Sequence, residues 1–180
     1  GEWVELTKLH GAENRTLVSI DDVPKHVKDA LISIEDERFY SHHGVDWKST
    51  AKAILGKLTG TSTRGGSTIT QQVIKNVTGD DEVTIKRKVS EIFRALRLEK
   101  NYSKDEILET YLNTVYFGNG CYGIEAAAEG YFGKTVSELS IAEAASIVGI
   151  TQFPYKYDPA RGDWYREQNK ERQLTVLYKM

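Results

Sequence analysis

Apolar residues recur at spacings of three and four along most of this 180-residue chain, which contains only three prolines. Positions three and four apart lie on the same face of an α-helix, so this spacing gives each helix one stripe to bury. Proline inside a helix would end or kink it, and its scarcity leaves long helices intact. The sequence therefore predicts a mainly α-helical domain.

The first twenty residues depart from this spacing. Residues 3–6 and 16–20 are short runs typical of β-strands, and residues 10–14 between them resemble a turn. We expect a short N-terminal β segment ahead of the helices.

Helix starts are marked by residues that can cap them. Pro24 suits the first turn of a helix that carries Val27, Leu31 and Ile34 and continues to Arg38. Further helices are expected after Asp46, Ser67 or Thr68, Thr84, Ser103 and Ser140, and the last from about Asp163. Ser103 and Ser140 each precede a glutamate by three residues, the spacing of a capping box. Residues 59–65 are rich in glycine and lack an apolar anchor, so we expect them to be mobile without ligand.

Composition limits the function classes. The formal net charge is -2, so the chain has no global attraction to nucleic acid, and its basic residues lack an interleaved aromatic stripe. The single Cys121 cannot form an internal disulfide and is expected to be a small packed residue. The most apolar stretch, residues 141–150, is interrupted by Glu143 and falls short of the ~18 residues that span a bilayer. We interpret the chain as a fragment of something longer.

Glu35 lies at the edge of the apolar stripe of the first expected helix, whereas Asp36 is expected to point roughly to the opposite side. A carboxylate at such a border can be partly desolvated, which suits it to act as a general base. A lone glutamate there is more often a solvated boundary residue. Here aromatic and histidine residues follow in 35–44, which favours a site. The adjacent His42 and His43 lack the spacing of a metal site.

The segment 64–75 combines glycines, hydroxyls, amides and a cation. Glycine lets the backbone approach a ligand closely, and a helix start capped by serine or threonine offers free N–H groups to an anion. No Walker spacing follows, so a nucleotide hydrolase is not indicated. An ordinary flexible loop ahead of a polar helix face is the plain alternative. The candidate binding side chains are Ser67, Gln71, Gln72 and Lys75.

Arg87 and Lys88 precede Glu91 by four and three residues and avoid the apolar stripe of their expected helix, which includes Ile85 and Val89. A solvated face with ion pairs of about 0.2–0.5 kcal/mol each is one interpretation. Base before acid is the less favourable order, however, so stability alone explains this trio weakly. A fourth segment, 104–113, is a capped amphipathic helix that is interpreted as scaffold.

Taken together, these segments resemble the peptidoglycan glycosyltransferase domain of class A penicillin-binding proteins and their monofunctional relatives. The family patterns EDxxFxxHxG, GGSTITQQ, RKxxE, KxxILxxYLN and RxxxVL match at residues 35–44, 65–72, 87–91, 104–113 and 172–177. The resemblance implies a lysozyme-like fold with a large lobe, a small jaw lobe beside the membrane and a cleft between them. The domain would span residues 1–180, with a membrane anchor and any C-terminal transpeptidase domain belonging to the longer protein.

The resemblance also implies an activity, the polymerisation of lipid II into β-1,4-linked glycan by an inverting glycosyltransferase that releases lipid pyrophosphate. Glu35 would be the general base and Glu91 a second essential acid. Contacts to sugar and pyrophosphate would come from Ser67, Gln71, Gln72, Lys75, Arg87 and Lys88, and a sugar contact from Tyr116. The implied partners are lipid II, the growing lipid-linked chain and the extracytoplasmic face of the bacterial cell membrane, with no nucleic acid.

Two other functions stay open at this point. A lysozyme-like glycan hydrolase would also place a glutamate in a helical cleft, but it needs an acid and water rather than an anion cradle. A silent glycan-binding module would have no use for Glu35 and Glu91. The motifs require no cofactor and no metal ligand set is indicated, although assistance by a divalent cation such as Mg²⁺ stays open.

Overall fold

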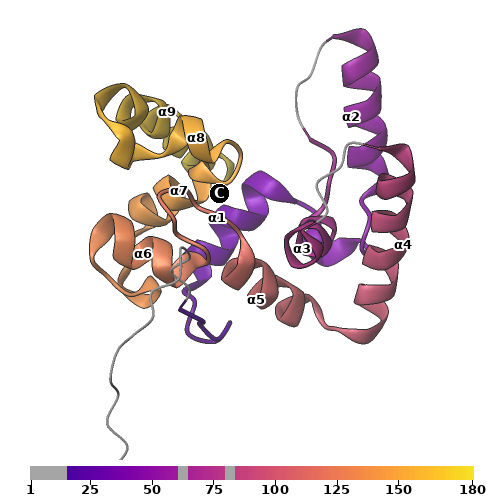
Figure 1. The fold of residues 1–180 in the computed structure, drawn as a ribbon, viewed down its shortest axis with the longest axis horizontal. Coiled ribbons are helices and arrows are strands. Elements are labelled where there is room, and N and C mark those ends of the chain that lie inside the picture. Colours follow the sequence, from indigo (N-terminus) through magenta and orange to yellow (C-terminus); the bar gives the residue numbers. More distant parts are fainter. Residues whose placement is uncertain (1–15, 61–64, 80–83) are drawn as a thin grey trace, which may run out of the picture.

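The structure is a computed structural model that describes residues 16–60, 65–79 and 84–180 (Figure 1). Within these parts the chain is built of helices joined by short loops. The α-helices are α1 (Lys25–Glu35), α2 (Trp47–Thr59), α3 (Ile69–Thr78), α4 (Ile85–Asn101), α5 (Lys104–Thr114), α6 (Ile124–Phe132), α7 (Ile141–Ile150), α8 (Pro154–Tyr157) and α9 (Asp163–Lys179). Three short 3₁₀ helices are η1 (Phe39–Ser41), η2 (Val136–Glu138) and η3 (Pro159–Arg161). The mainly α-helical prediction is confirmed.

The largest core lies around α7, which packs against α1, α6, α8 and α9. Every residue of α7 from Ala144 to Ile150 is buried, which explains why this stretch is apolar almost throughout. Leu31 of α1, Tyr111 of α5 and Ile124 of α6 are fully buried in the same core. Among the described residues, no helix combines the length and apolarity needed to cross a bilayer.

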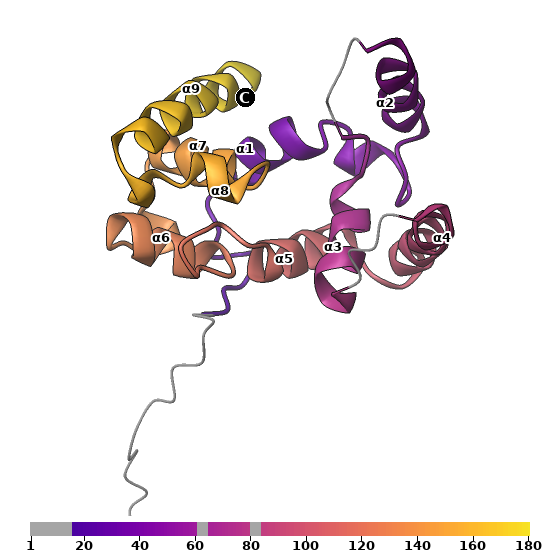
Figure 2. The same ribbon diagram turned by 45° about the horizontal axis from the view of Figure 1, so that its top comes forward.

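The helices form two groups that are joined through α1, α3 and α5. Figure 1 and Figure 2 both show α2 and α4 standing apart from the group of α6 to α9. Helix α3 packs against α4 and also against α5, so it connects the two groups. This division into a larger and a smaller part fits the lobe and jaw that the sequence resemblance implies.

Side-chain caps are confirmed at five of the predicted helix starts, whereas Pro24 directly precedes α1 instead of lying in its first turn. The side chains of Asp46, Thr68, Thr84, Ser103 and Ser140 each accept a hydrogen bond from a backbone N–H of the first helical turn. Each bond satisfies one of the N–H groups that a helix start leaves unpaired. The last helix begins at Asp163, as predicted.

The prediction of an N-terminal β segment is wrong for the part of that segment that the structure describes. Residues 16–20 form no strand and instead run along α5. The backbone of Val18 donates to Oδ1 of Asn113 and accepts from its Nδ2 at 2.9 and 2.8 Å, and Ile20 donates its N–H to Glu109. Side chains of a helix thus replace the partner strand. The predicted strand at 3–6 lies outside the described residues, as does the centre of the segment 59–65.

Helix α1 is shorter than predicted, and α4 presents a different face to the rest of the molecule than its apolar stripe indicated. Helix α1 ends at Glu35 rather than continuing to Arg38. In α4 the apolar residues Ile85 and Phe93 are 86% and 68% exposed, while the polar Glu91 is buried. The expectation that the apolar stripe of α4 faces the core is therefore wrong, because its polar face packs inward toward a cleft.

Candidate active site

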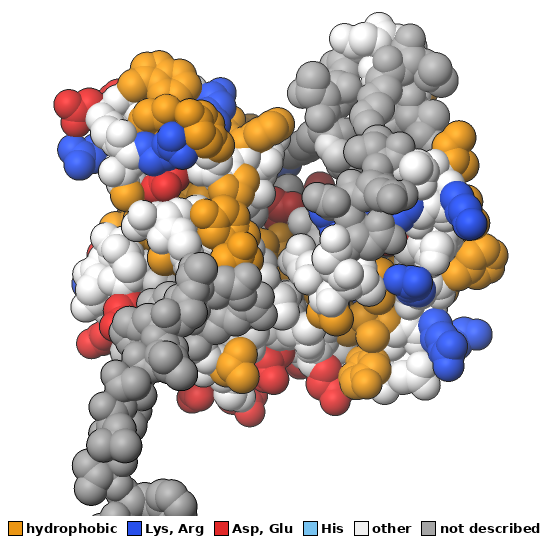
Figure 3. Space-filling view, in the orientation of Figure 1, with side chains coloured by type: hydrophobic (Ala, Val, Ile, Leu, Met, Phe, Trp, Pro, Cys, Tyr) orange, Lys and Arg blue, Asp and Glu red, His pale blue; other side chains and the backbone are white. Residues whose placement is uncertain are grey.

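A cleft of about 950 Å³ separates the two groups of helices. Its lining comes from α2, α3 and α4 of one group, from residues 151–153 and α9 of the other, and from α1, which packs against α7 and α9. Figure 3 looks into this hollow, where acidic and basic side chains are visible. The charged residues that line it include Glu35, Asp46, Lys52, Lys75, Arg87, Glu91, Arg172 and Lys179.

Glu35 is the last residue of α1, and its carboxylate is held by two side-chain donors. Nε2 of Gln72 donates to Oε2 at 3.0 Å, and the hydroxyl of Thr151 donates to Oε1 at 2.7 Å. The side chain is half-buried and lines the cleft. A carboxylate fixed in this way at a cleft wall can accept a proton from a ligand hydroxyl that approaches within hydrogen-bonding distance.

The amide of Gln72 is itself oriented by a buried tyrosine. The hydroxyl of Tyr111 donates to Oε1 of Gln72 at 3.2 Å. Burial, together with the negative charge of Glu35, raises the pKa of Tyr111 well above its usual value, so it stays a neutral donor. The amide NH₂ therefore faces Glu35, whose charged form can only accept.

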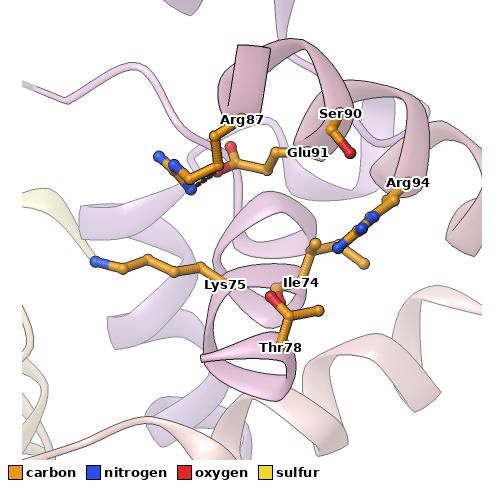
Figure 4. Close-up of a pocket in the computed structure, with 7 residues that line it drawn as sticks. All are labelled: Ile74, Lys75, Thr78, Arg87, Ser90, Glu91 and Arg94. Atoms are coloured by element: carbon orange, nitrogen blue, oxygen red, sulfur yellow. Dashed lines mark hydrogen bonds and ion pairs between the residues drawn. The ribbon is translucent and has the colours of Figure 1, made fainter. Parts of the chain in front are cut away.

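Glu91 sits between two cations on α4. Nη1 of Arg87 lies 2.8 Å from Oε2 of Glu91, and Nζ of Lys88 bonds Oε1. Only 5% of Glu91 is exposed and both cations are half-buried, so this trio is a partly buried cluster rather than a solvated helix face. Figure 4 shows the Arg87–Glu91 pair above Lys75, which extends from α3 and lines the same pocket. Lys75 and Glu91 therefore line one cleft.

The remaining residues predicted in the glycine-rich segment divide into two kinds. Oγ of Ser67 accepts from Nζ of Lys88 at 2.7 Å, which ties the segment to the cation cluster. Gln71 is buried, and its Oε1 accepts from the N–H of Thr68 as part of the capping box. Although Gln71 borders the cleft, its amide oxygen is used to hold the start of α3.

Tyr116 lies apart from the other predicted site residues. It forms an isolated antiparallel bridge with Tyr122 and stacks against its ring at 4.7 Å between centroids. Among the described residues that line the cleft, Tyr116 does not occur. Its sugar contact stays a prediction without support from this geometry.

Asp36 was expected to point away from the apolar stripe of its helix, and this prediction is wrong. Its carboxylate is buried and accepts from Nε2 of His42 at 2.8 Å and from the N–H of Ile69 at 3.0 Å. Asp36 thus ties the end of α1 to the start of α3, which places Glu35 beside Gln72. His42 serves this structural pair, and the described residues contain no group of three or more His, Cys, Asp or Glu arranged around a metal ion.

The edge of the cleft at α2 is fixed by Asp46 and by a close backbone approach. Burial alone would raise the pKa of Asp46, but hydrogen bonds from Ser49 and Arg38 outweigh it and leave the pKa lowered. A Cβ on Gly66 would lie 2.8 Å from Cβ of Ala53, so only glycine lets this segment lie against α2.

Sequence reasoning missed Thr151 and placed no weight on Lys179. Thr151 directly follows the apolar α7, and its hydroxyl finds Glu35 only through the packing of α7 against α1. No local pattern could have indicated this contact. Lys179, at the end of α9, reaches the same cleft from a residue 144 positions after Glu35.

The chain is similar to a known protein family and to several characterised proteins. The family model described as Transglycosylase matches residues 3–180. Penicillin-binding protein 1F of Bacillus subtilis (strain 168) is 46% identical over 174 residues, which cover 96% of this chain and 24% of that protein. Penicillin-binding protein 1A of Clostridium tetani is 47% identical over 172 residues, covering 92% of this chain and 22% of that protein.

A solved structure shares the fold. The crystal structure of penicillin-binding protein 1A from Haemophilus influenzae matches with a TM-score of 0.55 at 24% identity, over 95% of this chain and 16% of that one. The chain thus spans about a quarter or less of the length of the relatives that it matches.

Proposed function

The chain belongs to the transglycosylase family, and on that premise we propose that its cleft polymerises lipid II into β-1,4-linked glycan with release of lipid pyrophosphate. Glu35 accepts the proton of the 4-hydroxyl of the acceptor sugar while that oxygen bonds to the anomeric carbon of the donor chain. The bond from the anomeric carbon to the pyrophosphate breaks, and its electron pair leaves with the phosphate. Attack opposite the leaving group inverts the anomeric centre.

The base role rests on the contacts of Glu35. Two donors, Gln72 and Thr151, hold its oxygens in a fixed orientation at the cleft wall. Fixed orientation matters because a base must meet the attacking hydroxyl at about 2.6–3.2 Å for proton transfer. Gln72 is therefore assigned to Glu35 rather than directly to sugar.

The leaving group needs positive charge where negative charge develops. Lys75 is exposed in the cleft, and Arg87 of α4 lines the same cleft. Lys88 is not among the lining residues but bonds Glu91 and Ser67, which are. Glu91 holds these two cations in place and limits their repulsion, so we assign it a positioning role for the donor pyrophosphate. Ser67 joins this group through Lys88.

The single observation that carries the proposal is the presence of a held glutamate and a cation cluster in one cleft. A glycan hydrolase has no anionic leaving group and no need for the second cluster. A silent binding module would not need Glu35 held from two sides. Assistance by Mg²⁺ stays a matter for assay, with the described residues offering no acidic cage for it.

A membrane surface is the proposed setting, because the substrate carries a lipid. Helix α4 turns Ile85, Val89 and Phe93 outward, at 86%, 46% and 68% exposure. Exposed basic residues, Lys86, Arg94, Arg97 and Lys100, lie on the same helix. Apolar residues flanked by cations are typical of helices that lie in the interface of an anionic membrane. We place the domain at the extracytoplasmic face, within a longer protein that carries a further domain.

The test is the substitution Glu35→Gln, which keeps the shape of the side chain and removes the base. Polymerisation of lipid II by the purified chain, followed by gel separation of the glycan products, should fall by at least about a hundredfold. Binding of lipid II should persist, because the cations are untouched. Glu167→Gln, an exposed change on α9, serves as the matched control and should leave the rate unchanged. A Glu35→Gln protein that polymerises at the wild-type rate would exclude the base role.

A further inference from the structure

We propose that Thr151 is a positioning residue for Glu35 whose hydroxyl serves both protonation states of the base, donating to the carboxylate and accepting from the carboxylic acid. The inference rests on the proposed function, since it takes Glu35 to receive a proton during each turnover. It adds a residue that lies outside the segments that the sequence singled out.

The hydroxyl of Thr151 has one proton and two acceptors within reach. Oγ1 lies 2.7 Å from Oε1 of Glu35 and 2.8 Å from the backbone oxygen of Val148. A hydroxyl carries one donor hydrogen and two lone pairs, and the hydrogen rotates to suit its surroundings. While Glu35 is charged, the proton is directed at the carboxylate, since a hydrogen bond to a charged acceptor is the stronger one.

The second partner of Glu35 cannot reverse in this way. Nε2 of Gln72 bonds Oε2 and can only donate, and Tyr111 fixes the amide by donating to its Oε1. Tyr111 is fully buried, which leaves it little freedom to rearrange. A proton on Oε2 would therefore face an NH₂ group, whereas a proton on Oε1 faces an oxygen.

These contacts define what happens when Glu35 takes the proton of the acceptor hydroxyl. The new O–H bond forms as the hydroxyl oxygen bonds to the anomeric carbon and the bond to pyrophosphate breaks. The neutral acid then carries its hydrogen on Oε1, where Oγ1 of Thr151 accepts it. The hydrogen of Thr151 turns to the oxygen of Val148, which already lies at 2.8 Å. Only hydrogens move, so the carboxyl group keeps its position throughout the reaction.

The location of Thr151 fixes the position of its hydroxyl oxygen, while the hydroxyl hydrogen stays free to turn. It directly follows α7, in which Ile147, Val148 and Ile150 are fully buried. Its own N–H donates to the oxygen of Val148 at 3.3 Å, which closes a turn at the helix end. The hydroxyl is thus held by the core of the larger group of helices while it contacts a residue of the cleft.

The test compares Thr151→Val, which keeps the branched shape and removes the hydroxyl, with Thr151→Ser, which keeps the hydroxyl. Thr151→Val should lower kcat for lipid II polymerisation by about ten- to a hundredfold, because misplacing a reacting group by about 1 Å can cost about a hundredfold in rate. KM and direct binding of lipid II should change less than about twofold, because the contact is to Glu35. Thr151→Ser should recover kcat to within about threefold of wild type.

A matched control is Thr114→Val at the end of α5, where the hydroxyl donates to the backbone oxygen of Thr110 and does not line the cleft. It should keep the wild-type rate. If valine at 151 disturbs α7, as judged by thermal unfolding, Thr151→Ala makes the same comparison without added bulk.

The outcomes separate this inference from the function on which it rests. A wild-type chain that does not polymerise lipid II overturns both. A wild-type chain that does, together with Thr151→Val at the same kcat, overturns the positioning role alone. Equal losses in the valine and serine variants, or a loss confined to KM, would also overturn it, because they would assign Thr151 to packing or to binding.

Discussion

Glu35 and Asp36 are adjacent acids with different partners, and the difference decides their roles. Glu35 accepts only from side chains that border the cleft, so a ligand can reach its oxygens. Asp36 accepts from His42 and from the backbone of Ile69, and it is buried. Replacing Asp36 would therefore act on the fold first and on the base through it.

Gly44 is the residue at which backbone conformation matters most. Its φ is +84°, and a Cβ there would lie 2.8 Å from the backbone oxygen of Ala95 in α4. Its own oxygen accepts from the hydroxyl of Thr68 at 2.7 Å. We expect Gly44→Ala to lower the free energy of unfolding by at least about 2 kcal/mol, since strain and a backbone clash add.

Urea unfolding measures this effect, and Gly133→Ala is the matched control. Gly133 also has a positive φ, +63°, but an added Cβ meets nothing within 4 Å. Its cost should be limited to the strain of the left-handed conformation, about 1 kcal/mol. Equal losses at the two positions would show that the approach of α4 to Gly44 contributes nothing.

At the residue scale, the sequence indicated the site better than the contacts within it. Glu35 could be predicted because it borders an apolar stripe and because its segment resembles a family motif. The structural use of Asp36 could not, because its contact with Ile69 joins elements that only the tertiary fold brings together. The capping contact of Gln71 is local to the start of α3, three residues after Thr68. Thr151 lies 116 residues from its partner Glu35, beyond the reach of any local spacing.

The start of α7 is an element whose stability should depend on pH. Hydrogen bonds from Lys134 and from the backbone and hydroxyl of Ser140 lower the pKa of Glu143 from 4.5 to about 2. Because the folded pKa is lowered, this stabilisation is complete above about pH 4.5 and is lost as the pH falls toward 2.

We therefore expect Glu143→Gln to reduce the free energy of unfolding by about 1–2 kcal/mol at pH 7, after screening by solvent. Urea titrations between pH 3 and pH 7 should show the wild type and the variant converging as the pH falls. Glu171→Gln, an exposed change on α9, should give a constant offset. A gap between wild type and Glu143→Gln that does not change with pH would contradict the assigned ion pair.

Element boundaries followed from the sequence where capping residues act locally, and failed where tertiary contacts decide. Thr84 and Ser103 cap their helices as their spacing predicts. The predicted orientation of α4 was wrong because hydrophobic periodicity marks one face of a helix. It does not say whether that face meets the core or something outside the chain. Residues 16–20 have strand-like composition, but their backbone pairs with side chains of α5 instead of a strand.

At the scale of the whole molecule, the two groups of helices place unlike surfaces on the two sides of α4. Its inner side carries Arg87 and Glu91 at the cleft, and its outer side carries Ile85 and Phe93. Figure 3 shows hydrophobic side chains with basic ones between them on the side of the molecule where α4 lies. A helix with this arrangement can rest on a membrane while its polar face stays in the cleft, within reach of a lipid-linked substrate.

Phe93→Ser tests that arrangement because it removes apolar area from the outer side of α4 alone. An aromatic side chain that leaves water for a bilayer interface contributes up to about 2 kcal/mol, so binding to vesicles of anionic phospholipid should weaken by about five- to thirtyfold in a sedimentation assay. The fold should be unaffected, since Phe93 is 68% exposed. Leu174→Ser on α9 is the control, because Leu174 is similarly exposed, at 59%, on the opposite group of helices. If the two variants weaken vesicle binding equally, α4 does not face the membrane. If only Phe93→Ser does so, and turnover of a soluble, short-chain lipid II analogue is retained, then α4 holds the domain on the lipid surface and the cleft performs the chemistry independently.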